Sequence, residues 1–148
     1  MNINFNEQEL NNAENKGRNK VEKLLKQIGI TKYLFSENPT EVYDCIFITN
    51  EGKRVVAEIK NRDNKYANYS DMLLEKHKYD NLVKISKEMN ADPIYIHTYN
   101  NSNQIKITNL KDKEFIFKEQ YQQKTQLGNR NSIKKLLTYI TEFNIFNI

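Results

Sequence analysis

Two acidic residues and a lysine stand close together in a pair of segments that have the pattern of neighbouring β-strands. Asp44 lies within Val42–Ile48, and Glu58 and Lys60 lie within Arg54–Lys60, fourteen residues further on. Side chains alternate between the two faces of a strand, so Glu58 and Lys60 share a face. A three-residue hairpin loop between the segments, ending in glycine, would set Asp44 opposite Glu58. The pattern therefore predicts two carboxylates and an ammonium group within a few ångströms.

These residue types suit a divalent-metal site that cuts phosphodiester bonds. Burying a carboxylate among apolar neighbours costs several kcal/mol unless something compensates its charge. Mg²⁺ would do so, because it binds one or two carboxylates together with water and phosphate oxygens, and Mn²⁺ accepts similar ligands. Asp44, Glu58 and the Ile59 carbonyl would hold the ion, and Lys60 would orient the attacking water and offset charge on the phosphorane. The alternative is a structural salt bridge between Lys60 and one of the acids, without metal.

A helix must precede these strands and support them. It is predicted over Asn12–Ile28 and ends at Gly29. Glu22 lies beside its apolar stripe and can pair with Arg18 or Lys26 at four-residue spacing. The lysine and arginine near its start either meet phosphates or form an ordinary basic surface; they are Lys16 and Arg18. The stripe itself, at spacings of three and four, consists of Val21, Leu24, Leu25 and Ile28.

A polar segment without apolar periodicity, Asn61–Ser70, follows the second strand and is predicted to be a loop. In a nuclease such a loop would lie over the bound strand. Arg62 and Lys65 would then contact phosphates, and Tyr66 or Tyr69 would stack on a base or sugar. A solvated connection is the alternative.

The rest of the chain is predicted to alternate between strands and helices. Ser70 caps a second helix, which runs from Asp71 to about Met89. A last helix starts at Asn131 or Ser132, and the apolar segment after it packs on the core or forms a dimer contact. A polar loop before this helix has Lys124 and Arg130 as candidate substrate contacts. The expected strands are Pro93–Tyr99, Gln104–Thr108 and Glu114–Lys118; the last helix carries Ile133, Leu136, Leu137 and Ile140 on one face; the final segment is Phe143–Ile148.

With these residues and elements, the chain resembles the PD-(D/E)XK nuclease superfamily, in particular its Holliday-junction-resolvase-like and phage-type members. The resemblance is carried by Tyr43-Asp44, by Glu58-Ile59-Lys60 and by the preceding helix with Gly17 and Glu22. Tyr43 stands where the family motif has proline, which lowers the specificity of the match. The resemblance implies an α/β, restriction-endonuclease-like fold with an αβββαβ core and a mixed central sheet flanked by helices. A short β and α extension would follow at the C-terminus.

The resemblance also implies roles for residues outside the two strands. Glu22 would be a further carboxylate of the metal site, either directly or through water, with Glu14 as the less favoured substitute. Lys76 or Lys78 of the second helix would reach the metal-bound water or the phosphate. His77 lies between them, but no Cys or His stands near it in sequence, so a solvated helix histidine is the preferred interpretation.

Composition indicates one domain, 1–148, with a core large enough to be stable without disulfides or structural metal ions. Hydrophobic residues make up 38% of the 148 residues, and the mean hydropathy is −0.83. No apolar run has transmembrane length, and no secretory signal is visible. The single cysteine, Cys45, excludes an internal disulfide and fits a reducing compartment. Abundant Asn, Lys, Ile and Tyr suggest an A+T-rich genome, so the cytoplasm of a bacterial or phage-infected cell is expected.

A polyanionic partner fits the charge of the chain. Twenty-three basic residues exceed nineteen acidic ones, which gives a formal net charge of +4 and a pI of about 9.0. The sequence thus predicts a Mg²⁺-dependent endodeoxyribonuclease of the structure-specific or restriction and recombination type, a homodimer by resemblance. Two alternatives stay open: a catalytically inactive nuclease-like subunit that binds nucleic acid, and an assembly module. A partner protein would supply specificity in some of these cases.

Overall fold

The computed structural model describes residues 5–38, 41–123 and 132–148. Two α-helices, one short 3-10 helix and nine strands make up this part of the chain. In order they are α1 Phe5–Gln27, β1 Tyr33–Phe35, β2 Cys45–Ile48, β3 Arg54–Arg62, η1 Asn64–Asn68, β4 Met72–Glu75, α2 Lys76–Met89, β5 Asp92–Tyr99, β6 Gln104–Asn109, β7 Lys118–Gln123, β8 Ser132–Ile140 and β9 Asn144–Asn147.

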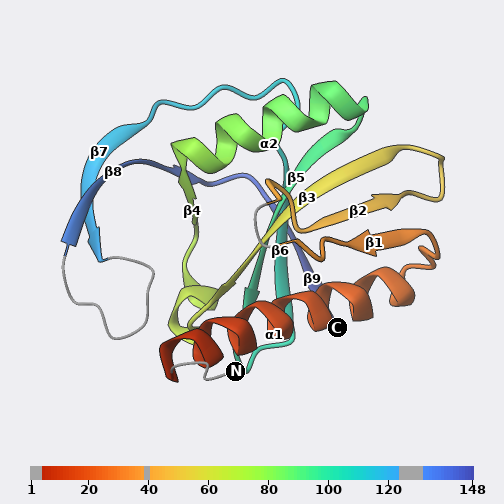
Figure 1. Cartoon of the computed structure of the whole chain (residues 1–148), viewed down its shortest axis with the longest axis horizontal. Coiled ribbons are helices and arrows are strands. Elements are labelled where there is room, and N and C mark those ends of the chain that lie inside the picture. Colours follow the sequence, from red (N-terminus) through yellow and green to blue (C-terminus); the bar gives the residue numbers. More distant parts are fainter. Residues whose placement is uncertain (1–4, 39–40, 124–131) are drawn as a thin grey trace.

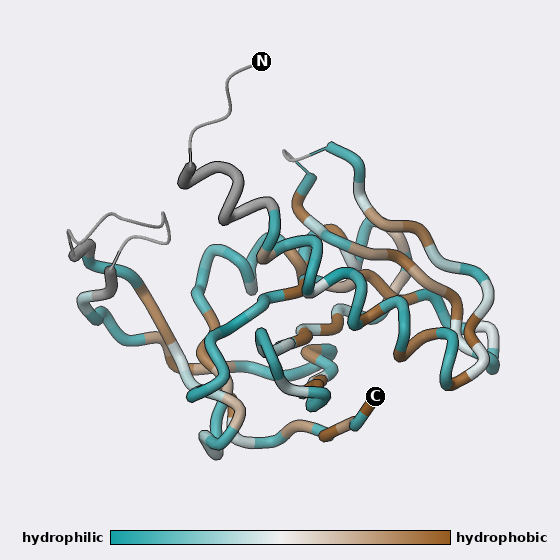
Figure 2. The backbone as a smooth tube through the Cα atoms, turned by 90° about the horizontal axis from the view of Figure 1, so that it is seen from below, coloured by the Kyte–Doolittle hydropathy of each residue, from teal (hydrophilic) through white to brown (hydrophobic). Residues whose placement is uncertain are grey.

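A mixed sheet of six strands, in the order β1-β2-β3-β5-β6-β9, forms the centre of the molecule. Only the β3–β5 pair is parallel within it. Figure 1 shows α1 along one side of this sheet and α2 along the other. Hydrophobic and hydrophilic segments alternate along the chain (Figure 2). The predicted α/β architecture with a mixed central sheet flanked by helices is confirmed.

Alternation along β3 gives the sheet a core on each side. Val55 and Ala57 pack with α1, and Val56 packs with α2 and β4. Glu58 continues the second of these faces, because it lies two residues beyond Val56. A carboxylate is therefore aligned with core residues, on the side of the sheet that α2 covers.

The β2–β3 hairpin has the predicted register. Cys45 pairs with Ala57, and Thr49 donates its N–H to the Lys53 carbonyl at 2.8 Å across a three-residue loop. Gly52, the last loop residue, has a φ of +84°, which explains the need for glycine. The strand begins at Cys45 and not at Val42, so it is shorter than predicted.

Helix α1 lies unusually close to the sheet beside the end of β3. A Cβ atom at Gly17 would be 3.2 Å from Ile59 Cγ2 and 3.2 Å from Thr98 Oγ1. Glycine therefore permits the contact between the helix and strands β3 and β5. The helix ends as predicted, before Gly29 with a φ of +82°, but it begins earlier than Asn12.

The predicted helix from Asp71 to Met89 is wrong in its first part. Met72–Glu75 forms strand β4, which pairs antiparallel with β8, and α2 begins only at Lys76. Ser70 therefore does not cap the helix. The loop over 61–70 is also shorter than predicted, because Asn61 and Arg62 belong to β3. A four-residue strand has too few positions to show a period of its own, and its partner residues in β8 lie 62 to 68 positions away.

The predicted C-terminal helix is wrong as well. Ser132–Ile140 is strand β8, in the middle of a three-stranded sheet of order β4-β8-β7. The extension is thus β-structure, without the expected helix. Residues 113–117 form no strand, and β7 starts only at Lys118. The predicted substrate contacts Lys124 and Arg130 lie outside the described residues. The final segment does pack on the core, because β9 pairs with β6, and Phe146 and Ile148 contact the cluster beneath α1.

Within the described ranges, no helix has the length and apolarity needed to cross a bilayer.

Candidate functional site

A cleft of about 890 Å³ opens where the N-terminal half of α1, the ends of β2 and β3, the start of α2 and strand β8 meet. All three residues of the predicted chemical centre lie in it. The acidic and basic side chains that line it are Glu14, Lys16, Arg18, Glu41, Asp44, Glu58, Lys60, Arg62, Asp63, Glu75, His77, Lys78 and Lys135.

Asp44 is fixed by hydrogen bonds at the start of β2. Its Oδ2 accepts a hydrogen bond from the Ile59 N–H at 2.8 Å, and its own N–H donates to the Ala57 carbonyl at 2.8 Å. Arg18 Nη2 lies 3.5 Å from Oδ1, and Arg18 Nη1 donates to the Ser36 carbonyl at 2.6 Å. The β2–β3 register, continued by one residue, sets Asp44 opposite Glu58.

Glu58 is a buried carboxylate with a raised pKa. Its residue is only 8% exposed, and Lys78 Nζ lies 3.1 Å from Oε1. Burial and, after it, the Asp44 carboxylate raise the pKa of Glu58 to about 7, against the opposing effect of the Lys78 and Lys60 ammonium groups. Two carboxylates thus repel each other in a site that excludes most water.

Lys60 shares the cleft with both acids but pairs with neither. Within the described part of the chain its ammonium group makes no ion pair and no hydrogen bond, whereas Asp44 pairs with Arg18 and Glu58 with Lys78. Burial lowers the pKa of Lys60, and so does the positive charge of Arg62. The alternative of a structural salt bridge between Lys60 and an acid is therefore not formed.

Glu75 and Lys135 belong to the site, and sequence reasoning missed them. Glu75 is 7% exposed; its Oε1 lies 3.0 Å from Lys135 Nζ and its Oε2 lies 3.4 Å from His77 Nδ1. Burial opposes ionisation of Glu75, but the hydrogen bond and charge of Lys135, then the charge of Lys60, bring its pKa below the ordinary value. The only sequence signal was an acid that ends an apolar run, Met72–Glu75.

The remaining predicted site residues are divided between the cleft and its surroundings. Glu14 lines the cleft, whereas Glu22 does not and pairs with Lys26 at 3.6 Å. Lys78 lines the cleft, whereas Lys76 pairs with Asp80 at 2.6 Å. Arg62 lines the cleft, and η1 next to it carries Lys65 and Tyr66.

The donor atoms at the carboxylate pair suit a hard dication. Two carboxylates and the Ile59 carbonyl are oxygen ligands, and Mg²⁺ uses few protein oxygens and completes its shell with water and phosphate. Burial and the neighbouring Asp44 carboxylate raise the pKa of Glu58, and a bound cation would favour its charged form. In the described ranges, no group of three or more His, Cys, Asp or Glu side chains is arranged to hold a metal, so any such site is an open one.

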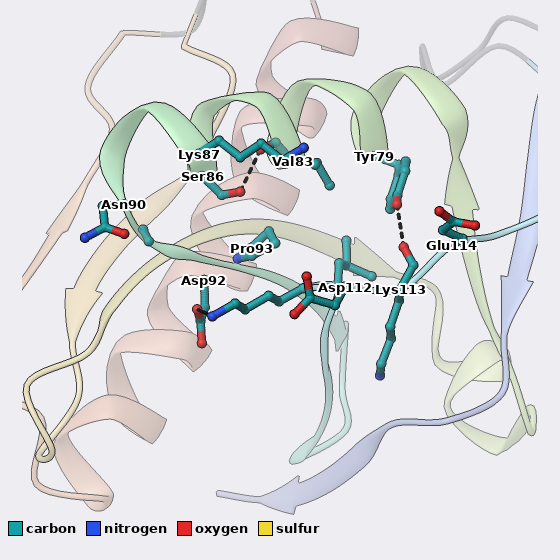
Figure 3. Close-up of a pocket in the computed structure, with 13 residues that line it drawn as sticks. Tyr79, Val83, Ser86, Lys87, Asn90, Asp92, Pro93, Asp112, Lys113 and Glu114 are labelled. Carbon is teal, nitrogen blue, oxygen red and sulfur yellow. Dashed lines mark hydrogen bonds and ion pairs between the residues drawn. The ribbon is translucent and has the colours of Figure 1, made fainter.

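A second depression, of about 800 Å³, lies between α2 and residues 110–114 (Figure 3). Several of its charged and hydroxyl groups are engaged in local contacts. Lys111 Nζ lies 3.6 Å from Asp92 Oδ1, and the Tyr79 hydroxyl donates to the Lys113 carbonyl at 2.5 Å. No carboxylate that lines it is buried as Glu58 and Glu75 are. The cleft beside β3 is therefore the candidate site.

Comparison with solved structures finds a similar fold. The structure of Archaeoglobus fulgidus Hjc, a Holliday junction resolvase from an archaeal hyperthermophile, matches with a TM-score of 0.51 and 9% sequence identity. The match covers 84% of this chain and 86% of that chain. No protein-family profile matches the sequence, and no curated protein matches it. At this identity the likeness concerns the fold.

Proposed function

The chain has the restriction-endonuclease-like fold of the PD-(D/E)XK superfamily, and from this premise we propose that it is a Mg²⁺-dependent endodeoxyribonuclease. The observation that carries the proposal is the cleft itself. There Asp44 faces a buried Glu58 across the β2–β3 pair, and Lys60, whose ammonium group forms no ion pair with a described residue, lines the same space.

Asp44, Glu58 and the Ile59 carbonyl would hold Mg²⁺, with Mn²⁺ as a substitute. The bound ion would polarise the scissile phosphate and supply positive charge for the attacking oxygen. Lys60 orients the attacking water and offsets the charge that develops on the phosphate. Of the two helix glutamates, Glu14 lines the cleft and Glu22 does not, so we place Glu14 first as a further carboxylate and keep Glu22 as the second choice.

Arg18 and Lys78 now neutralise the two acids, and both are within reach of a phosphate in the cleft. When a cation takes the carboxylates, these side chains are released to contact phosphate oxygens. Arg62 at the end of β3, and Lys65 and Tyr66 beyond it, extend the nucleic-acid surface. Lys76 pairs with Asp80 and is therefore the least favoured of the proposed nucleic-acid contacts.

The proposal takes residues 1–148 as one nuclease domain that acts on DNA in the cytoplasm of a bacterial or phage-infected cell. A homodimer would supply the second site that cutting two strands requires. We assign it to the structure-specific or the restriction and recombination type of nuclease.

A second candidate is a subunit that binds nucleic acid without cutting it. The observation in its favour is that Arg18 and Lys78 already neutralise Asp44 and Glu58 without a metal ion.

Cleavage of a set of DNA forms separates the two candidates. Purified protein is incubated with supercoiled plasmid, linear duplex, single strands and a four-way junction, in Mg²⁺, Mn²⁺ or EDTA. We expect metal-dependent cutting that Asp44→Asn abolishes while DNA binding persists, because the change removes a ligand and a repulsive charge. Lys60→Ala should lower the rate by about two to four orders of magnitude.

Asp80→Asn is the matched control, since it removes an exposed carboxylate on α2 and should cut normally. Cutting by Asp44→Asn at the wild-type rate would refute the site assignment. Binding without cutting in either metal would favour the non-cutting subunit.

A further inference from the structure

Helix η1 and the residue that follows it, Tyr69, present two exposed aromatic rings after the strand that carries the site. Tyr66 is 37% and Tyr69 is 50% exposed. Their ring centroids are 5.1 Å apart at an interplanar angle of 72°, and Lys65 Nζ lies 5.0 Å from the centroid of the Tyr66 ring. Aromatic rings beside a cation are the components of sequence-tolerant binding to single-stranded nucleic acid.

A buried lysine fixes the backbone of these two tyrosines. Lys106 on β6 is 1% exposed, and its Nζ donates to the Tyr69 carbonyl at 2.6 Å and to the Tyr66 carbonyl at 3.4 Å. The rings of Phe143 and Tyr99 lie 5.0 Å and 5.5 Å from the same nitrogen. Within the described residues this ammonium has no carboxylate at ion-pair distance.

The contacts of Lys106 indicate that the two tyrosines are held in place to bind a ligand. Burying an ammonium without a counter-ion is costly, and here both of its hydrogen-bond acceptors belong to the exposed aromatic residues. Side-chain contacts brace η1 at two further points: Asp63 Oδ1 accepts from Lys65 N at 3.3 Å, and Asn64 Oδ1 accepts from Asn101 N at 2.6 Å. A ligand would therefore meet rings whose backbone is already ordered, which lowers the entropic cost of binding.

The rings also lie next to the cleft. Arg62 and Asp63 line it, and η1 starts at the following residue. Figure 1 shows this turn between β3 and β4, beside the N-terminal half of α1. A phosphate in the cleft would bring a neighbouring nucleotide to η1.

We propose that Tyr66 and Tyr69 form a stacking platform for an unpaired nucleobase next to the scissile phosphate, and that Lys106 is its positioning residue. The proposal deepens the proposed function, on which it rests for the position of the phosphate. A base within a duplex is stacked on both sides and has no free face, and extruding it costs several kcal/mol. The occupant is therefore a single-stranded or branched segment.

Binding without metal tests the platform independently of cleavage. In EDTA, fluorescence anisotropy compares labelled single strand, blunt duplex and duplex with a single-stranded overhang of equal phosphate number. We expect Tyr69→Ala to weaken binding of the single-stranded and overhang forms by about 5- to 100-fold and to leave blunt duplex within twofold. Tyr69→Phe should retain the affinity.

Tyr121→Ala is the matched control, because this tyrosine is 74% exposed on β7, outside the cleft and η1. It should bind all forms as the wild type does. Lys106→Met should reproduce the selective loss, with circular dichroism to confirm its fold; if it does not fold, the tyrosine variants alone decide.

A fluorescent probe gives a second readout. The chain has no tryptophan, so Tyr69→Trp introduces a single indole whose emission stacking would quench. We expect quenching by the single strand and the overhang, and little by blunt duplex. Equal affinity losses for paired and unpaired forms, or none, would overturn the platform, as would a protein that binds no nucleic acid.

The two proposals fail separately. Selective binding by a wild type that never cuts would refute the nuclease and leave the platform in place. Metal-dependent cutting together with an unaffected Tyr69→Ala variant would refute only the platform.

Discussion

The two central carboxylates differ in their surroundings. Asp44 accepts a backbone hydrogen bond and has Arg18 beside it, whereas Glu58 is buried and has the raised pKa of about 7. In the metal-free protein at neutral pH, Glu58 is therefore close to half protonated. Magnesium would compete with that proton for the same oxygen atoms.

We expect Glu58→Gln to stabilise the metal-free protein at high pH. A carboxyl group with a folded pKa of about 7, against a reference value of 4.5, binds its proton more tightly in the folded state. Its contribution to the free energy of unfolding is complete below about pH 4.5 and is lost as the pH rises through 7. The amide has no proton to lose. Thermal unfolding in EDTA should show a gain of about 5 °C at pH 8, roughly 2 kcal/mol, and little gain at pH 5.

Glu51→Gln, an exposed change in the hairpin loop, serves as its control and should show no such pH dependence. The same gain at both pH values would mean that the charge of Glu58 is not the cause.

The residues of the β2–β3 hairpin could be predicted because they are local. A period of two and a three-residue loop set Asp44, Glu58 and Lys60 in one place. Their partners could not be predicted, since Arg18 is 26 residues from Asp44 and Lys135 is 60 residues from Glu75. No spacing rule connects residues that only tertiary packing brings together.

At the level of elements, the two wrong helix predictions concern β4 and β8, which pair with each other. Residues 133, 136, 137 and 140 have helical spacing, yet Leu137 and Ile140 are buried on opposite faces of a strand while Leu136 is 43% exposed. Buried residues occur on both faces of β8, so its hydrophobic pattern does not alternate. Pairing with β4 and β7 decided the conformation, as context often does for short apolar runs.

The Glu75–Lys135 ion pair joins this second sheet to the cleft, and we expect its loss to be costly. Lys135→Met should lower the free energy of unfolding by about 3 kcal/mol, because it leaves a buried carboxylate without its partner. The double variant Glu75→Gln, Lys135→Met should recover most of that loss. Chemical denaturation of the wild type, the two single variants and the double variant measures the coupling.

Lys134→Met is the neighbouring control. Lys134 lies 2.9 Å from Glu119, but both side chains are more than half exposed, so the change should cost less than about 1 kcal/mol. A double variant as unstable as Lys135→Met would show that the two charges are not coupled.

In the molecule as a whole, the cleft lies where the six-stranded sheet meets the three-stranded one. The segment from α1 to α2, which includes the additional strand β4, supplies the acids and Lys60, and the C-terminal extension adds Lys135. Substrate binding would thus depend on both ends of the chain. The net charge of +4 is spread over the chain, so a local patch must supply the affinity.

We expect DNA affinity to depend steeply on salt. If three phosphates are engaged, the dissociation constant should rise about 40-fold between 50 and 200 mM salt. Lys78→Ala should reduce the slope of log affinity against log salt concentration by the equivalent of about one phosphate contact. Lys84 is an exposed lysine of α2 outside the cleft, so Lys84→Ala should leave the slope unchanged. Titrations at several salt concentrations give the slope; an affinity independent of salt would argue against phosphate contacts.

Cys45 is a natural chemical probe for local opening of the structure. It is the only cysteine in the chain, it is fully buried, and it pairs with Ala57 next to both carboxylates. Burial, with the Asp44 charge adding to it, raises the pKa of its thiol to about 12. Its side chain belongs to the core cluster beneath α1, so a thiol reagent can reach it only when this core opens, and the labelling rate measures how often the structure next to the two acids opens.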